Sequence, residues 1–169
     1  MSLVQPRTLT AERLREVLDY DPETGVFRWK VWRGNGARCG GVAGGRNKGG
    51  YWAIELDRRS YLAHRLAWLY VHGEWPACVM DHSDLDKVNN RIANLREATR
   101  AQNKANSLTQ NNNKLGVKGV YRIPSGRFRA SIRVNYQLIN LGTFATQEAA
   151  AAAYEEAARK HFGIFARAA

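Results

Sequence analysis

Apolar residues recur at helical spacing in three parts of the chain, and each part is bounded by capping or turn residues. The first follows Thr10, a good N-cap residue, and runs into the turn-forming segment 21–25. The second spans 64–72 and stops at Gly73, which suits a helix C-terminus. The third spans 146–162 and is rich in alanine. These patterns predict three helices, the first of them ended by the turn at 21–25.

Alternation with a period of two predicts strands between these helices. The predicted strands of this part are 26–29, 51–56, 61–63, 79–82 and 92–98. The polar turn 57–60 joins the second to the third, and the loop 83–90 joins 79–82 to its returning partner. Thr99 can cap a further helix directly after the last strand. We therefore expect a β-hairpin followed by a helix that faces back across it.

The C-terminal part contains a strand with one basic face. Along it, apolar residues alternate with Arg127, Arg129, Ser131 and Arg133. Segments 118–122 and 138–142 supply neighbouring strands, and the small residues of the alanine-rich helix would let it lie close on the sheet. The predicted fold class is α+β: a hairpin and helix module, then a three-stranded antiparallel sheet plus one helix.

Composition adds that the chain is globular and strongly basic. Its 169 residues are 44% hydrophobic and 24% charged, with a net charge of +11 and a pI of about 10.1. The excess is +5 over residues 1–112 and +6 over the shorter segment 113–169. A polyanion is the expected partner. The alternative is a soluble basic protein whose charge causes only non-specific binding.

The stretch 102–113 is rich in asparagine and glutamine and cannot bury a core, so its second half is predicted to be a linker. The expected organisation is a first domain over 1–108 with its motif core at 61–108, a polar linker over 109–114, and a second domain over 115–169. Inside the first domain, the glycine-rich segment 34–50 is either a surface loop or a flexible basic arm on a phosphate backbone.

Cysteine usage and hydropathy argue against several protein classes. Cys39 and Cys78 stand far apart and form no C-x-x-C pair, so a disulfide framework and a thiolate zinc site are not expected. The N-terminus has no secretory apolar region, and no apolar run approaches the roughly 18 residues of a membrane span. A cytoplasmic location is expected, in the host cell if the chain is phage-encoded.

The candidate chemistry lies at Asp81-His82, with Asn94 twelve residues after the histidine and Asn103 nine residues further. A carboxylate beside a histidine, with amides returning from a nearby helix, suits one divalent metal and one general base acting on a phosphodiester. Each residue also has a structural explanation, because Asp-His pairs and asparagine-rich loops are common in surface turns.

Further polar residues around these four complete a longer motif: Asp84, Asn89-Asn90-Arg91, Leu95-Arg96, Thr99, Gln102 and Asn106. Together with the upstream segment 61–66, the run resembles the HNH endonuclease motif in the variant common among phage and intron homing nucleases. That family is built on a β-hairpin and a helix around one metal, so the resemblance implies a ββα-metal module.

The resemblance also implies roles for individual residues. Asp81 and Asn103 would be ligands of Mg²⁺, or of the similar Mn²⁺, as oxygen donors to a hard cation. His82 would be the general base, and Asn94 would hold its imidazole in the working orientation through a side-chain or loop hydrogen bond. Asn90 and Arg91 are expected to support the site.

One position departs from the family pattern. The family places a glycine two to three residues beyond the histidine, where the chain turns tightly, and here Leu85 stands in that place. A leucine at positive φ is strained. Either the loop follows another path or the site is partly compromised.

The C-terminal part is similar to the Apetala-two domain of plant ethylene-response factors. The similarity rests on residues 119–120, 126–128, 130–133, 141–144, 148–150, 153–154 and 157–158. That family lays its sheet in the major groove, which implies DNA contacts by Lys118, Arg122, Arg127, Arg129, Arg133 and Asn140. Ser125, Leu138 and Asn140 replace some of its reading-face residues, and for any single arginine a solvated strand face is the alternative.

The two resemblances predict a metal-dependent DNA endonuclease of the homing or phage-borne type, a phosphodiester hydrolase whose partner is double-stranded DNA. A monomer or weak dimer is expected, with no membrane partner and no small-molecule cofactor beyond the metal. The alternative is a non-catalytic DNA-binding protein derived from an HNH nuclease. RNA binding is less favoured, because no pair of aromatic residues interleaves the basic strand face.

Overall fold

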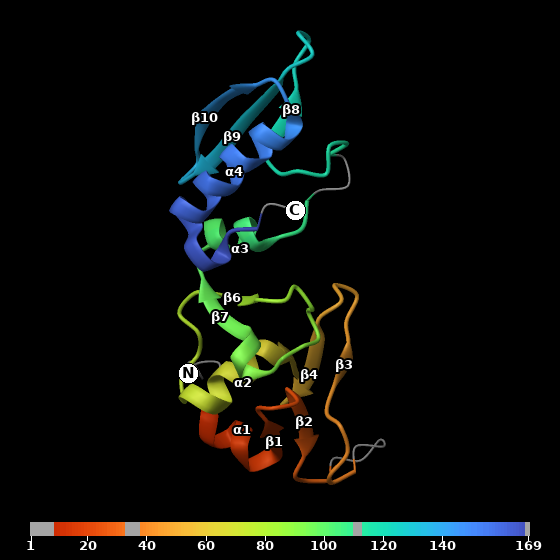
Figure 1. Cartoon of the computed structure of the whole chain (residues 1–169). Helices are drawn as coiled ribbons and strands as arrows, with labels where there is room; N and C mark the ends of the chain where they lie inside the picture. The colour runs from red at the N-terminus through yellow and green to blue at the C-terminus, as the bar shows by residue number, and fades with distance from the viewer. Residues whose placement is uncertain (1–8, 33–37, 110–112, 168–169) are drawn as a thin grey trace, which may run out of the picture. The chain divides into compact units, whose positions relative to one another are not determined.

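The computed structural model describes residues 9–32, 38–109 and 113–167. Contacts divide the chain into two compact units, Met1–Glu97 and Ala98–Ala169 (Figure 1). This division falls earlier than the boundary expected at residue 108, so the helix after Thr99 is counted with the second unit. Part of the predicted linker, residues 110–112, and part of the glycine-rich segment, residues 33–37, lie outside the described residues.

The first unit begins with a short helix and a hairpin. Helix α1 (Ala11–Val17) starts at Thr10, whose hydroxyl accepts a hydrogen bond from the Arg13 amide as predicted for an N-cap. The prediction that the turn at 21–25 ends this helix is wrong. Strand β1 (Leu18–Asp21) follows α1 directly, and the turn joins it to β2 (Val26–Trp29). Burial of Leu18 and Tyr20 on one side of β1 explains the difference, because alternate residues share a strand face.

A three-stranded sheet and one helix complete the core of this unit. The sheet contains β3 (Gly45–Arg46), β4 (Trp52–Leu56) and β5 (Arg59–Leu62), in the order β3-β4-β5. Helix α2 (Ala63–His72) ends at Gly73 in the left-handed conformation, as its sequence predicts. The core is formed by apolar residues that include Leu14, Leu18, Phe27, Ile54, Leu56, Leu66 and Leu69.

Strands β6 (Val79–His82) and β7 (Leu95–Ala98) pair with each other after α2. The predicted returning strand starts later than expected, because Ile92–Asn94 forms a 3₁₀ turn, η1, before β7. The loop 83–91 leads from β6 to η1 and contains Asp84, Asn89, Asn90 and Arg91 of the predicted motif.

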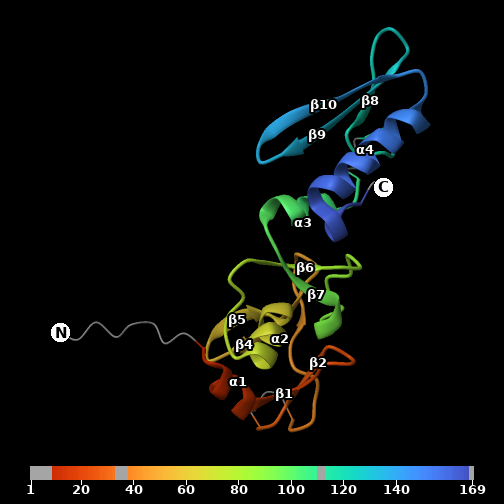
Figure 2. The ribbon, with the colours of Figure 1, turned by 60° about the vertical axis from the view of Figure 1, so that its left-hand side comes forward.

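The second unit consists of a short helix, a sheet and a long helix. Helix α3 (Arg100–Asn106) begins at Thr99, which forms a capping box with Gln102. The sheet contains β8 (Val120–Arg122), β9 (Phe128–Val134) and β10 (Gln137–Phe144), all antiparallel, with β9 in the centre. Helix α4 (Gln147–Phe162) lies along one face of this sheet and is followed by the 3₁₀ turn η2 (Gly163–Phe165) (Figure 2). The predicted α+β class and the sheet-plus-helix arrangement are confirmed.

Small residues let α4 approach the sheet closely. Ala130 and Ile132 of β9 are buried in one cluster with Ala150, Tyr154 and Ala158 of α4. Gly119, just before β8, has φ +65°, and a Cβ at that position would lie 2.4 Å from the Tyr154 ring. The predicted packing of the alanine-rich helix therefore follows from small side chains on both elements.

Two hairpins in the chain turn through two residues with positive φ. Asp57 and Arg58 connect β4 to β5, and Asn135 and Tyr136 connect β9 to β10. Such turns match the twist of antiparallel strands and favour Asn-Gly, so a side chain at the second position is unusual. None of the helices in the described ranges has the length and apolar character that crossing a bilayer requires.

Candidate functional site

Asp81 and His82 end strand β6 and are both buried. Their exposed fractions are 4% and 5%, and Met80 before them is also in the core. A histidine and a carboxylate at such burial must each have polar partners, because an uncompensated buried charge is costly. The partners come from β7 and from the loop between β6 and β7.

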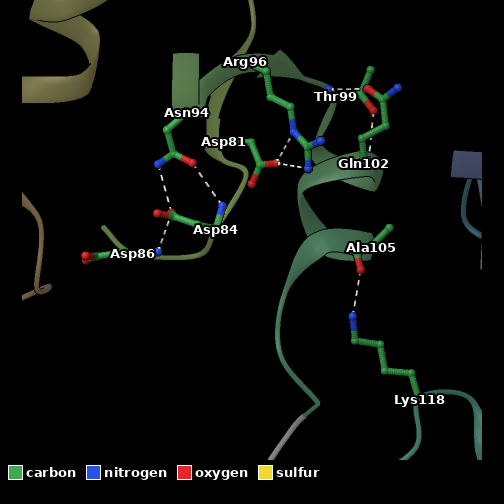
Figure 3. A network of polar contacts seen from close by, with 9 residues as sticks. All are labelled: Asp81, Asp84, Asp86, Asn94, Arg96, Thr99, Gln102, Ala105 and Lys118. Atoms are coloured by element: carbon green, nitrogen blue, oxygen red, sulfur yellow. Dashed lines mark hydrogen bonds and ion pairs between the residues drawn. The ribbon is translucent and has the colours of Figure 1, made fainter. Parts of the chain in front are cut away.

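Arg96 of β7 compensates the Asp81 carboxylate. Its Nε donates to Asp81 Oδ2 at 2.9 Å, and its terminal nitrogen lies 2.9 Å from the same oxygen (Figure 3). The Arg96 side chain is 19% exposed, so this ion pair is only weakly screened by solvent. The sequence motif included Arg96, but neither composition nor spacing identified it as the counter-ion of Asp81.

Asn90 contacts the imidazole of His82 and determines its tautomer. The Nδ2 of Asn90 donates to the Val88 carbonyl at 3.1 Å, so Asn90 Oδ1 faces His82 Nε2, 3.3 Å away. An amide oxygen only accepts hydrogen bonds, so this contact fits a ring that carries a proton on Nε2. The Asn90 backbone is itself held by the Tyr20 hydroxyl, which donates to its carbonyl at 2.7 Å.

Asn94 acts on the loop that follows His82 rather than on the ring itself. Its Oδ1 accepts from the Asp84 amide at 3.1 Å, and its Nδ2 donates to Asp84 Oδ1 at 2.9 Å (Figure 3). The same Nδ2 donates to the Asn89 carbonyl at 2.9 Å, and the Ser83 amide donates to the Asn94 carbonyl at 2.9 Å. Asn94 was predicted to orient His82 either by a hydrogen bond from its side chain to the ring or by hydrogen bonds to the loop. The contacts given above are hydrogen bonds to the loop.

Asp84 is the acceptor that closes this loop. Burial raises the pKa of its carboxyl, but hydrogen bonds from Asn89, Asn94 and the Asp86 amide outweigh that effect, so the pKa is lowered overall. Asp84 therefore stays ionised at neutral pH. Arg91 is exposed at the far end of the loop, where its amide donates to Asn89 Oδ1 at 3.4 Å.

The loop does make its tight turn at Leu85. Leu85 has φ +70°, and its amide donates to the His82 carbonyl at 3.0 Å. The left-handed conformation that the family gives to a glycine is thus adopted here by a leucine, at a cost of about 1–2 kcal/mol. Leu85 therefore places backbone strain beside the histidine, and partial impairment of the site stays a prediction.

His64 is a second histidine at this site. Helix α2 holds it at 5% exposure, with its ring edge-on to His82 at 5.0 Å between centroids and 84° between planes. The Tyr51 ring lies 5.5 Å from His64 and 6.2 Å from His82. Burial, together with electrostatic interactions with His82 and Arg65, lowers the pKa of His64 to about 4, so it is neutral at pH 7. Only the segment 61–66, noted as the entry to the motif, pointed towards it.

Asn103 lies on α3, in the second unit, where its amide donates to the Thr99 carbonyl at 2.9 Å. Its pairing with Asp81 as a metal ligand stays a prediction that depends on spacing. One carboxylate and one or more amide oxygens are suitable ligands for a hard cation such as Mg²⁺, which retains several water ligands when it binds to a protein. Within residues 9–32, 38–109 and 113–167, the His, Cys, Asp and Glu side chains form no cluster of three or more that could hold a metal.

In the second unit, most of the predicted DNA-binding residues share the sheet face opposite α4. Register places Arg129 beside Tyr121 and Thr143, and Ser131 beside Asn140. Arg133 pairs with Leu138 on the same face, and paired residues of antiparallel strands project to one side. Arg127, two residues before Arg129, donates to the Thr143 carbonyl at 3.1 Å. This face is therefore basic and open.

Lys118 and Arg122 are placed differently. The Lys118 ammonium donates to the carbonyls of Ala105 and Arg167, at 2.7 and 3.0 Å, which ties α3 and the chain end to the start of β8 (Figure 3). Burial, with Arg167 and Lys104 nearby, lowers its pKa to about 8. Arg122 is two residues after the buried Val120, so both side chains project to the sheet face that α4 covers. Arg122 itself is exposed.

Replacing Leu85 by glycine should stabilise the first unit. Glycine adopts φ +70° without strain but loses more backbone entropy on folding, so we expect the free energy of unfolding to rise by up to about 1 kcal/mol. Urea unfolding followed by tryptophan fluorescence measures this, because all five tryptophans lie in residues 1–97. Leu85→Ala keeps the backbone penalty and is the matched control. Equal gains in both variants would assign the effect to the side chain instead.

Acidification should destabilise the first unit through His64. Its folded pKa of about 4 lies below the unfolded value near 6.5, so the unfolded chain binds the extra proton and stability falls as pH drops between these values. The loss attributable to His64 reaches up to about 3 kcal/mol at the acid end. The same urea assay at pH 7 and pH 4.5 should show a flatter dependence for His64→Phe. His72→Gln, at an exposed position on the same helix, should retain the wild-type dependence.

Comparison with known proteins follows the same residues. Residues 61–105 match the family model described as HNH endonuclease. The chain is also 35% identical, over 121 residues, to an uncharacterized HNH endonuclease of Acanthamoeba polyphaga mimivirus. That alignment covers 70% of this chain and 62% of the relative, and no solved structure matches. The likeness to HNH endonucleases is therefore carried by residues 61–105, the segment that contains Asp81, His82, Asn94 and Asn103.

Proposed function

We propose that this protein is a divalent-metal-dependent DNA endonuclease in which His82 is the general base. The observation that carries the proposal is the buried Asp81-His82 pair, in which Asn90 faces Nε2 and leaves the basic lone pair on Nδ1. A general base needs an imidazole held in a fixed orientation, and the burial of His82 and its contact with Asn90 provide this. The family match over residues 61–105 supports the same role.

In the proposed reaction, Nδ1 of His82 takes a proton from a water molecule as the water oxygen attacks phosphorus. The P–O3′ bond breaks, and the products are a 5′-phosphate and a 3′-hydroxyl that takes its proton from solvent. Asn90 keeps Nε2 protonated while Nδ1 becomes charged, so the imidazolium retains a hydrogen-bond acceptor on its other side.

Asp81 and Asn103 would hold the cation, which when bound supplies Lewis-acid stabilisation of charge on the phosphate and the leaving oxygen. Arg96 holds the Asp81 carboxylate in place beside the base through its ion pair and hydrogen bond. Asn94 and Asp84 keep the backbone after His82 in its closed turn. His64 packs against the base as a neutral ring and so adds no second positive charge.

We further propose that the second unit is an Apetala-two-type DNA-binding module that directs cleavage, as in a homing or phage-borne nuclease. Its support is the open sheet face with Arg127, Arg129 and Arg133, and the absence of acidic residues between 120 and 144. A nuclease module with little base readout gains site choice from a tethered reader, which raises its effective concentration near the target.

Substitution of His82 should abolish cleavage without abolishing DNA binding. With Mg²⁺ and supercoiled plasmid, His82→Ala should nick or linearise at a rate at least about 100-fold below wild type, since it loses the general base. A chelator should stop the wild-type reaction. His72→Ala changes an exposed histidine of the same unit and should cleave normally.

The outcome of this assay also decides between the two candidate functions. If wild type, His82→Ala and the chelated sample all leave the plasmid intact while each still shifts it on a gel, the protein is a non-catalytic DNA-binding derivative. Cleavage by wild type that the two controls remove supports the endonuclease.

Removing an arginine from the open sheet face should weaken DNA binding and flatten its salt dependence. Arg129→Ala and Arg133→Ala should each reduce the slope of log K against log salt by about 0.9 for every phosphate that the arginine binds. Arg159→Ala is the matched control, because Arg159 is exposed on α4 and paired with Glu155. Fluorescence anisotropy with a labelled duplex, in chelator, gives both quantities. An unchanged slope in the sheet variants would place the DNA elsewhere.

A further inference from the structure

The tip of the β9–β10 hairpin holds a tyrosine in a conformation that costs free energy. Asn135 and Tyr136 have φ values of +48° and +68°, between the paired residues Val134 and Gln137. A two-residue turn of this kind favours Asn-Gly, and a bulky residue at its second position is strained by about 1–2 kcal/mol. Glycine would remove that strain at this position.

No packing within the second unit explains the tyrosine. Its side chain is 90% exposed, the highest fraction among the exposed large apolar and aromatic residues of the described chain. Among the described residues it takes part in no recorded hydrogen bond, ion pair or ring contact. Strained residues of this kind cluster at functional sites, so the position of Tyr136 suggests that its side chain contacts a binding partner.

The surroundings of Tyr136 indicate a polyanion. Strand β8 pairs only with residues 128–130 of β9, so the hairpin of β9 and β10 extends past the end of β8 (Figure 2). The side chains next to the tip on this face are those of Arg133 and Leu138. Tyr136 also borders a cavity of about 880 Å³, whose charged lining residues are all basic: Arg100, Lys104, Lys118 and Arg133.

We propose that Tyr136 is an aromatic contact to duplex DNA at the tip of the β9–β10 hairpin. A two-stranded ribbon fits the major groove, where the basic face directs it along the backbone. The Tyr136 ring packs on a nucleotide, on its sugar or on an exposed base edge, while Arg133 binds the adjoining phosphate. This inference rests on the proposed DNA-binding role of the second unit and adds an uncharged contact to it.

Replacing Tyr136 separates a folding role from a binding role because the two predict opposite signs. In Tyr136→Gly the second unit should be more stable, with a higher midpoint in thermal unfolding followed by circular dichroism at 222 nm. Its affinity for a labelled duplex, measured by anisotropy in chelator, should nevertheless fall about fivefold. Tyr136→Phe keeps the ring and should bind within about twofold of wild type.

Salt dependence identifies the kind of interaction that Tyr136 makes with the duplex. Because Tyr136 carries no charge, Tyr136→Gly should shift log K by the same amount at every salt concentration and leave the slope unchanged, unlike Arg133→Ala. Unchanged affinity in Tyr136→Gly, with wild type binding the duplex, would overturn the inference alone. Absence of duplex binding by wild type would overturn the proposed role of the second unit and the inference with it.

Tighter binding of duplex RNA than of duplex DNA, with the same loss of affinity in Tyr136→Gly, would also overturn the inference, because the assigned partner is DNA. The matched duplexes need the same length and sequence, so that only the helical form and the 2′-hydroxyls differ.

Discussion

The site depends on the ion pair between Asp81 and Arg96. The Asp81 side chain is 4% exposed and has lost most of its hydration, and Arg96 of the neighbouring strand supplies polar contacts in place of water. This pairing joins β6 to β7 at the level of the site and fixes the end of β6, from which His82 follows. His82 stands at that strand end. The loop that Asn94 holds and the turn at Leu85 follow directly after it in the chain.

The loop between the two strands combines tight hydrogen bonding with local strain. Asn94 and Asp84 form three hydrogen bonds with each other and with the Asn89 carbonyl, and they hold the chain in a turn that strains Leu85. Strain at such a place persists only where the surrounding contacts over-determine the backbone. The hairpin tip at Tyr136 differs in this respect. The twist of β9 and β10 imposes the turn there, and within the described part of the second unit no contact of the exposed Tyr136 ring offsets the backbone strain.

Much of the fold follows from local sequence. Helix α2 with Gly73, the cap at Thr99 and the helix from Thr146 are confirmed, because capping chemistry acts within a few residues. The predicted turn at 57–60 is present but shorter, since Arg59 and Ser60 already belong to β5. The errors arose where tertiary contacts decide. β1 replaced the end of the first helix because Leu18 and Tyr20 bury on one side, and η1 displaced the start of β7. The likeness to HNH endonucleases was also recognisable from the spacing of Asp81, His82, Asn94 and Asn103, and the matched segment 61–105 contains these positions.

The sequence by itself determined which chemical groups this protein carries and at what spacing: a carboxylate, a histidine and amides in one segment, and a strand with one basic face in another. Only the tertiary structure decided how those groups are arranged in space. It assigned Asn90 rather than Asn94 to the imidazole, Arg96 to Asp81, and His64 to the ring of His82. The reason is that residue type and spacing are local properties of the sequence. Folding buries side chains from α2, β6 and β7 next to one another, and buried polar groups need hydrogen-bond or ionic partners, which these neighbours supply.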